Sequence, residues 1–143
     1  MIYFDSSALI KRYLREAGTE AVNSIIGIEK IISSSKLTYP ETLSAFMRKL
    51  RTGEIEKKPF QTAVEQFEND WKYLLVVEFH DELLPIIKGL MVEYPLKGAD
   101  SVHLSSAIWL ERTAREKVTF VASDDNLLKA ARAERLKTIN PLD

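Results

Sequence analysis

The chain has 143 residues, with 20 Lys and Arg against 21 Asp and Glu for a net charge of −1, and it contains no cysteine. This length suits one domain with a buried core, over residues 1–143, and the near-neutral charge argues against bulk electrostatic binding of nucleic acid while leaving room for a local basic patch. The lack of cysteine excludes disulfides, thiolate zinc sites, iron–sulfur clusters and a cysteine nucleophile, and no apolar run approaches the ~18 residues that span a bilayer.

The first predicted strand, Met1–Phe4, ends directly at a carboxylate, Asp5. Apolar residues then recur at helical spacing as far as Leu14, and Ser6 is available as an N-cap, so a helix is predicted to follow this strand. The next predicted elements are a helix from Gly18 to about Ile28 and a strand over Lys30–Ser33.

The clearest helix begins after Thr38 and ends before Gly53, because its apolar residues recur at i, i+3, i+4 and i+7: Leu43, Phe46, Met47 and Leu50. After it, in chain order, the sequence predicts a helix from Pro59 to Trp71, a strand over Leu74–Phe79, helices over Asp81–Glu93 and Gly98–Glu116, a strand over Val118–Ala122, a helix over Asp124–Arg135 and a short strand over Leu136–Ile139.

This alternation of strands and helices predicts an α/β fold. The strands are apolar without polar alternation, which is typical of a parallel sheet that helices cover on both faces. Right-handed crossovers between parallel strands place the carboxyl ends of all strands at one edge, which is where the sites of open α/β sheets form.

Four carboxylates fall at the ends of predicted strands or in the first turns of predicted helices, namely Asp5, Glu41, Asp100 and Asp124. Asp5 and Asp124 follow strands and therefore project from the same edge of the sheet, and we hypothesise that all four converge there. Each has a plainer interpretation, because acids stabilise helix N-termini, and Thr38 followed by Glu41 also matches a capping box.

Convergence would favour a metal ion. Two like charges ~4 Å apart repel by ~1–4 kcal/mol, so a carboxylate cluster is destabilising unless protons or cations occupy it. With no cysteine and only two histidines, the available ligands are oxygens, which favour Mg²⁺ or Mn²⁺ over Zn²⁺. Carboxylate-held Mg²⁺ acts on phosphate substrates, so the hypothesis implies phosphoryl transfer or phosphodiester hydrolysis by metal-activated water.

Four segments carry a resemblance to a known family: Phe4–Leu9, Pro40–Glu41, Gly98–Leu104 and Ser123–Leu128 with Ala130 and Ala131. In this order and spacing they resemble the PIN-domain ribonucleases, and more narrowly the VapC-type toxins of toxin–antitoxin pairs. The resemblance covers essentially the whole chain. It implies a three-layer α/β/α sandwich with a central parallel sheet, and an endoribonuclease that hydrolyses RNA with Mg²⁺ or Mn²⁺.

The resemblance also implies roles for individual residues. It makes four acids both catalytic residues and metal ligands, namely Asp5, Glu41, Asp100 and Asp124, with Asp5 and Asp100 as the most direct ligands. Ser6 matches a supporting hydroxyl residue. Asp125 stays open as an alternative to Asp124, because Ala122 stands where the family often has Ser or Thr, although the spacing to Leu127 favours Asp124.

Basic residues near the acids are candidates for binding RNA phosphates: Lys11, Arg12, Arg15 and Arg48. The alternative for each is a solvated helix face. His103 lies three residues after Asp100 and could reach the site, although a partly buried structural role fits it better. The family resemblance does not make it a general base.

Two other enzyme classes lack their required residues. A haloacid-dehalogenase-type phosphatase needs a second Asp where this chain has Ser7, and a receiver domain needs an acidic pair and a later Lys that are both missing. A solo PIN nuclease of RNA processing and a non-catalytic PIN-like scaffold stay open. The resemblance implies a small antitoxin protein as partner and a homodimer, and residues 1–5 lack the features of a secretory signal, so we expect a cytoplasmic protein.

Overall fold

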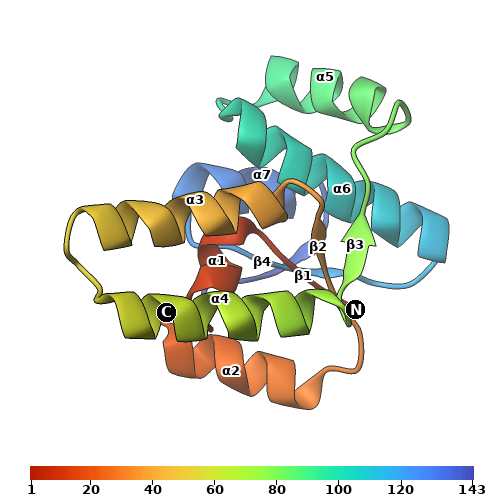
Figure 1. Cartoon of the computed structure of the whole chain (residues 1–143). Helices are drawn as coiled ribbons and strands as arrows, with labels where there is room; N and C mark the ends of the chain where they lie inside the picture. The colour runs from red at the N-terminus through yellow and green to blue at the C-terminus, as the bar shows by residue number, and fades with distance from the viewer.

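The computed structural model describes residues 1–143 as a five-stranded sheet with helices on both faces (Figure 1). Its elements are β1 (Ile2–Phe4), α1 (Ser6–Ile10), α2 (Thr19–Ile28), β2 (Ile32–Ser35), α3 (Thr38–Arg51), α4 (Lys57–Trp71), β3 (Leu75–Val77), α5 (Leu83–Glu93), α6 (Gly98–Ala114), β4 (Thr119–Val121), α7 (Asp125–Ala133) and β5 (Lys137–Ile139). All neighbouring strands are parallel, in the order β3-β2-β1-β4-β5. The predicted α/β/α sandwich is confirmed.

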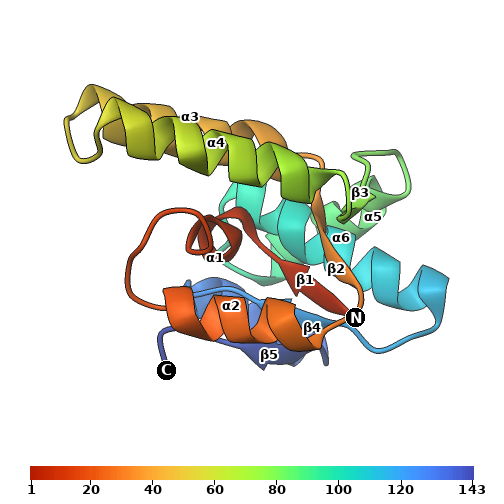
Figure 2. The same ribbon diagram turned by 60° about the horizontal axis from the view of Figure 1, so that its bottom comes forward.

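The three layers follow from how buried side chains alternate along the strands. In β1, Ile2 and Phe4 pack in a core with α1, α2, α3 and α4, whereas Tyr3 packs in a second core with α5, α6 and α7. In β4, Val121 joins the first core and Phe120 the second. Because both faces are buried, these strands carry no polar alternation. In Figure 2, α3 and α4 lie side by side as an antiparallel pair above the sheet.

Strand β2 lies two residues later than predicted and buries three consecutive serines, Ser33–Ser35. The Ser33 hydroxyl donates to the carbonyl oxygen of Ile2, and the Ser34 hydroxyl to that of Phe4, each at 2.7 Å. Buried hydroxyls destabilise a core unless they are hydrogen-bonded, and the neighbouring strand β1 supplies the acceptors here. The prediction of a strand over Lys30–Ser33 relied on apolar residues. It could not include the serines, because the hydrogen bonds that make their burial possible are made to another strand.

The capping box that was the plainer interpretation of Thr38 and Glu41 does not form. The N-cap of α3 is Leu37, which makes no side-chain capping bond, and Thr38 is already helical. The Thr38 hydroxyl instead lies 2.6 Å from the Ser34 hydroxyl in the buried space between β2 and α3. Glu41 is therefore not engaged in capping, and its carboxylate is available to other partners.

Helix α1 ends at Ile10, four residues before the predicted end at Leu14. Beyond it the backbone forms turns, in which Arg12 and Tyr13 donate to carbonyls three residues earlier. Both side chains bind one carboxylate oxygen of Asp70 on α4, Arg12 Nε at 2.6 Å and the Tyr13 hydroxyl at 2.9 Å. These contacts with α4 hold the segment in turns. The spacing of apolar residues along the sequence contains no information about them, because the partner lies 57 or 58 residues away.

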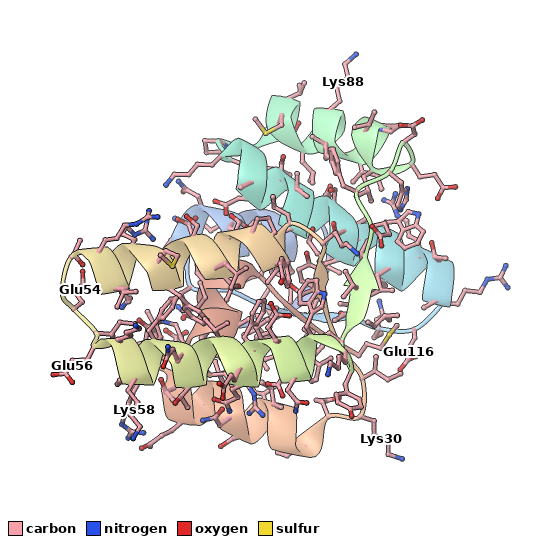
Figure 3. The ribbon with its side chains drawn as sticks, viewed as in Figure 1. Lys30, Glu54, Glu56, Lys58, Lys88 and Glu116 are labelled. Atoms are coloured by element: carbon pink, nitrogen blue, oxygen red, sulfur yellow. The ribbon has the colours of Figure 1, made fainter.

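Charged side chains occupy the outside of the sandwich. Figure 3 shows Glu54, Lys58 and Lys88 extending away from the ribbon, and all three are exposed. None of the helices combines the length and the apolar character needed to cross a membrane.

Replacing Ser34 by alanine is expected to lower the free energy of unfolding by about 1–3 kcal/mol, because the buried Thr38 hydroxyl loses its partner. Urea unfolding measures this change. Ser44→Ala, at an exposed position of α3, is the matched control and should shift stability by less than about 0.5 kcal/mol. Equal effects of the two substitutions would contradict the role of the Ser34 hydroxyl.

Candidate active site

The site lies at the carboxyl-terminal edge of the sheet, where β1 and β4 end side by side. Phe4 pairs with Val121, and the backbone N–H of Asp5 donates to the Val121 carbonyl at 3.1 Å. Asp124 follows β4 three residues after Val121. Asp5 and Asp124 therefore come from adjacent strand ends, as the strand assignments predict.

Asp5 is buried, with 3% of its surface exposed, and it caps α1. Its Oδ1 accepts the backbone N–H of Ala8 at 2.8 Å, so Asp5 is the N-cap and the prediction of Ser6 in that position is wrong. The reason is that the extended backbone at Asp5 aims a carboxylate at the N–H groups of the first turn. Ser6 is the first helical residue.

Burial raises the pKa of Asp5 to about 6. The nearby charge of His103 and the Ala8 N–H oppose this shift, whereas the negative charges of Asp100 and Glu41 add to it. Asp5 thus lies within electrostatic range of two of the other predicted site acids. A buried carboxyl among like charges is a common feature of functional sites.

Glu41 lies in the first turn of α3 and faces α6, where His103 is its partner. The His103 Nε2 and Glu41 Oε1 atoms are 2.7 Å apart. Partial burial by itself would raise the pKa of Glu41, but the hydrogen bond and the charge of His103, with a further hydrogen bond from Ser6, hold that pKa below its usual range. These partners therefore favour the ionised form of Glu41, whereas burial opposes the ionisation of Asp5.

Asp100 and Asp124 form the other side of the site. Partial burial raises the pKa of Asp100, the negative charge of Asp124 raises it further and Glu41 adds a smaller effect, against the opposing charges of His103 and Lys97. Asp124 caps α7, with Oδ1 accepting the Leu127 N–H at 2.9 Å.

Asp125 differs from Asp124 in its surroundings. Both residues are exposed, but the charge of Asp124 raises the pKa of Asp100, whereas Asp125, in the first turn of α7, is not among the residues that shift that pKa. The structure thus brings Asp124 to the other acids, and it does not do the same for Asp125.

The four acids share an edge without closing a coordination shell. No three Asp, Glu or His side chains are close enough to hold a metal ion by themselves. Mg²⁺ keeps several of its waters and requires only one or two direct carboxylates, however, and Mn²⁺ prefers the same oxygen ligands. Carboxylate oxygens are the donors that such a hydrated ion prefers, and Asp5 and Asp100 would be its most direct ligands.

A groove of about 400 Å³ opens beside Glu41 and is lined by Ser6, Ser7 and Arg48 among others. Arg48, a predicted RNA-binding residue, lines the same groove as Glu41, is exposed there and makes no ion pair.

The other three basic candidates are paired elsewhere. Lys11 is buried and its Nζ donates to Glu16 at 3.1 Å, and Arg12 is bound to Asp70. Arg15 is exposed and pairs with Glu20 at 2.9 Å, outside the groove. Lys11 and Arg12 thus already have carboxylate partners within the protein, Arg15 pairs at the exposed surface away from the groove, and their phosphate-binding role stays a prediction.

His103 combines the two interpretations that the sequence leaves open. It is buried, with 1% of its surface exposed, and it also contacts a site acid directly. Its spacing from Asp100 was the one sequence signal for this contact. Its second partner, Tyr3, is 100 residues away along the chain, and no spacing rule could have identified it.

Comparisons with known proteins agree with this architecture. A family model described as PIN domain matches residues 2–133. The chain is 29% identical over 108 residues to Ribonuclease VapC45 of Mycobacterium tuberculosis (strain CDC 1551 / Oshkosh), over 76% of this chain and 75% of that protein.

Two solved structures share the fold. The structure of FitAB bound to an IR36 DNA fragment has a TM-score of 0.73 at 16% identity, over 100% of this chain and 96% of that chain. VapBC2 from Rickettsia felis, bound to a DNA fragment from their promoter, has a TM-score of 0.66 at 16% identity, over 98% of each chain. At such identities the likeness concerns the fold alone.

Replacing Asp5 by asparagine is expected to stabilise the metal-free protein at pH 7. The carboxyl has a pKa of about 6 when folded and near 3.8 when unfolded, so its ionisation destabilises the folded state progressively as the pH rises through that window. Asparagine keeps the N-cap and removes this effect, which amounts to roughly 3 kcal/mol at most at pH 7 and little at pH 4.

Urea unfolding in EDTA at the two pH values measures the difference between wild type and Asp5→Asn. The control is Asp125→Asn, at an exposed position in the first turn of α7, which should show no gain that depends on pH. An Asp5→Asn variant that is no more stable than the wild type at pH 7 would show that the Asp5 carboxylate is not destabilising there.

Proposed function

The chain belongs to the PIN domain family, and from that membership and the geometry of its acidic edge we propose that it is a metal-dependent endoribonuclease and the toxin of a type II toxin–antitoxin pair. The observation that carries this proposal is the gathering of carboxylates at one sheet edge, where burial raises the pKa of Asp5 and Asp100 and the negative charges of neighbouring site acids add to both shifts. The relatives named as VapC ribonucleases support RNA as the substrate.

The site residues have different roles in the proposed reaction. Asp5 and Asp100 concentrate negative charge in a partly desolvated place, which makes binding of a divalent cation favourable. Mg²⁺ or Mn²⁺, when bound, acts as a Lewis acid toward phosphate oxygens and makes water a stronger nucleophile at neutral pH. Glu41 stays ionised beside this place because His103 and Ser6 stabilise its charge. Arg48 would bind an RNA phosphate in the groove next to Glu41.

The proposed partners follow from the same surface. Solved structures of the same fold include VapBC2 and a toxin–antitoxin complex from Klebsiella pneumoniae, which supports a small antitoxin as partner. An arginine of that partner would suit the carboxylates. We also propose a homodimer, since the exposed side chain of Phe79 borders an apolar hollow lined by Leu37, Pro40 and Val102. Such a protein is expected to act in the cytoplasm.

Purified protein with Mn²⁺ is expected to cleave RNA, and EDTA should abolish the cleavage. Asp100→Asn should reduce the rate by more than about 100-fold, because a direct ligand contributes more than the 10–100-fold typical of outer-shell partners. Asp81→Asn, at an exposed position before α5, is the matched control and should cleave like wild type. Cleavage that survives both EDTA and Asp100→Asn would contradict the proposed mechanism, and absence of cleavage on a broad RNA pool would favour the non-catalytic scaffold.

Arg48→Gln is expected to weaken binding of single-stranded RNA and to reduce the slope of log affinity against log salt by about 0.7, the effect of losing one phosphate contact. Fluorescence anisotropy in EDTA measures binding without cleavage. Arg15→Gln removes the same charge outside the groove and is the control. If the two variants change the salt slope equally, Arg48 contributes only to net charge.

A further inference from the structure

A buried hydrogen-bonded chain runs from the central strand to the site. The Tyr3 hydroxyl on β1 lies 2.9 Å from Nδ1 of His103 on α6, and the opposite ring nitrogen, Nε2, lies 2.7 Å from Glu41 Oε1 on α3. These two hydrogen bonds thus connect strand β1 with helices α6 and α3, which pack on opposite faces of the sheet. Nothing in the proposed cleavage reaction requires Tyr3, so its presence needs a separate explanation.

The hydrogen-bonding capacities of Tyr3, His103 and Glu41 determine which group donates each of the two hydrogen bonds. An ionised carboxylate only accepts hydrogen bonds, so Nε2 of His103 must carry the hydrogen that it shares with Glu41. In the neutral imidazole the other nitrogen, Nδ1, is then an acceptor. In the neutral ring the Tyr3 hydroxyl is therefore the donor to Nδ1, whereas in the protonated ring Nδ1–H donates to the Tyr3 oxygen instead. Burial raises the pKa of Tyr3 well above its usual range, so the phenol keeps its proton.

Packing prevents the two rings from turning. Tyr3 is completely buried and stacks on Phe120 with ring centroids 5.6 Å apart and planes within 12°. The His103 ring meets Tyr3 edge-on at 6.1 Å, and the hydroxyls of Ser35 and Ser106 lie beside the phenol. By contrast, 29% of the Glu41 side chain is exposed, and the hydrogen bonds of His103 and Ser6 are what restrain it.

We propose that His103 is a positioning residue that holds the Glu41 carboxylate toward the other acids, and that Tyr3 keeps His103 in the Nε2–H tautomer required for this. The inference rests on the proposed function, because it assigns a purpose to Glu41 within that site. His103 itself touches neither substrate nor metal. Partners of this kind orient metal-binding carboxylates, and losing them typically weakens metal affinity about 10–100-fold.

The tautomer can be read without metal or RNA. The protein has only two histidines, so ¹⁵N NMR of histidine-labelled chain gives two imidazole signals, which His80→Gln assigns. We expect a bound proton on Nε2 of His103 in the metal-free wild type, and a loss of this single tautomer in Tyr3→Phe, which keeps the ring and removes the hydroxyl. A proton on Nδ1 instead, or an unchanged signal in Tyr3→Phe, would overturn the proposal.

The positioning itself is tested by Mn²⁺ titration calorimetry on full-length protein without RNA. His103→Leu should bind Mn²⁺ roughly tenfold more weakly, and His103→Gln, whose amide can still donate to Glu41, should recover most of the affinity. His80→Gln, the matched control, should bind like wild type. Thermal unfolding verifies that each variant is folded. Equal affinity of wild type and His103→Leu, or equal losses in the Leu and Gln variants, would overturn the positioning role.

The two proposals fail in different ways. A wild type that binds no Mn²⁺ would refute the metal-dependent function, while the NMR signals would still decide whether the Tyr3–His103–Glu41 chain exists. A wild type that binds Mn²⁺ and cleaves RNA while His103→Leu matches it in both would leave the function intact and refute only the positioning.

Discussion

The buried carboxylate of Asp5 at the end of the central strand is the constraint on which the site depends. Strand β1 lies in the middle of a parallel sheet with helices on both faces. The residue that directly follows it, Asp5, is therefore largely shielded from solvent. The Ala8 N–H at 2.8 Å offsets part of the desolvation but leaves the pKa of Asp5 at about 6. The fold therefore retains a destabilising group, which is typical of positions selected for activity rather than for stability.

The other acids reach Asp5 from different layers of the sandwich. Glu41 comes from α3 on one face, Asp100 from α6 on the other, and Asp124 from the end of β4 within the sheet. His103 joins the two helical layers through its contact with Glu41. Since no single layer contains the whole site, the charges come together only when both cores are packed, and the site is lost with the tertiary structure.

Ion pairs elsewhere decide which basic residues are free for a substrate. Glu16 neutralises Lys11, and Asp70 neutralises Arg12 while also binding Tyr13. The segment that follows α1 is thereby tied to the body of the protein by its own cations. Arg48 is left unpaired in the groove beside Glu41. A chain of net charge −1 can in this way present one local positive charge where a phosphate would lie.

The sequence by itself determined the order of the elements, the parallel sheet and the places of the four candidate acids at strand ends and helix starts. Apolar strands separated by helices have few possible arrangements, and a strand ends where its apolar run stops. It placed β2 two residues early and extended α1 to Leu14, because the serine bonds to β1 and the contacts of Tyr13 with Asp70 are made between distant segments. Only the tertiary structure decided that Asp5 rather than Ser6 caps α1, that the charge of Asp124 rather than that of Asp125 acts on Asp100, and that His103 links Tyr3 to Glu41. Each of these depends on the direction of a side chain across layers, which spacing along one segment does not contain.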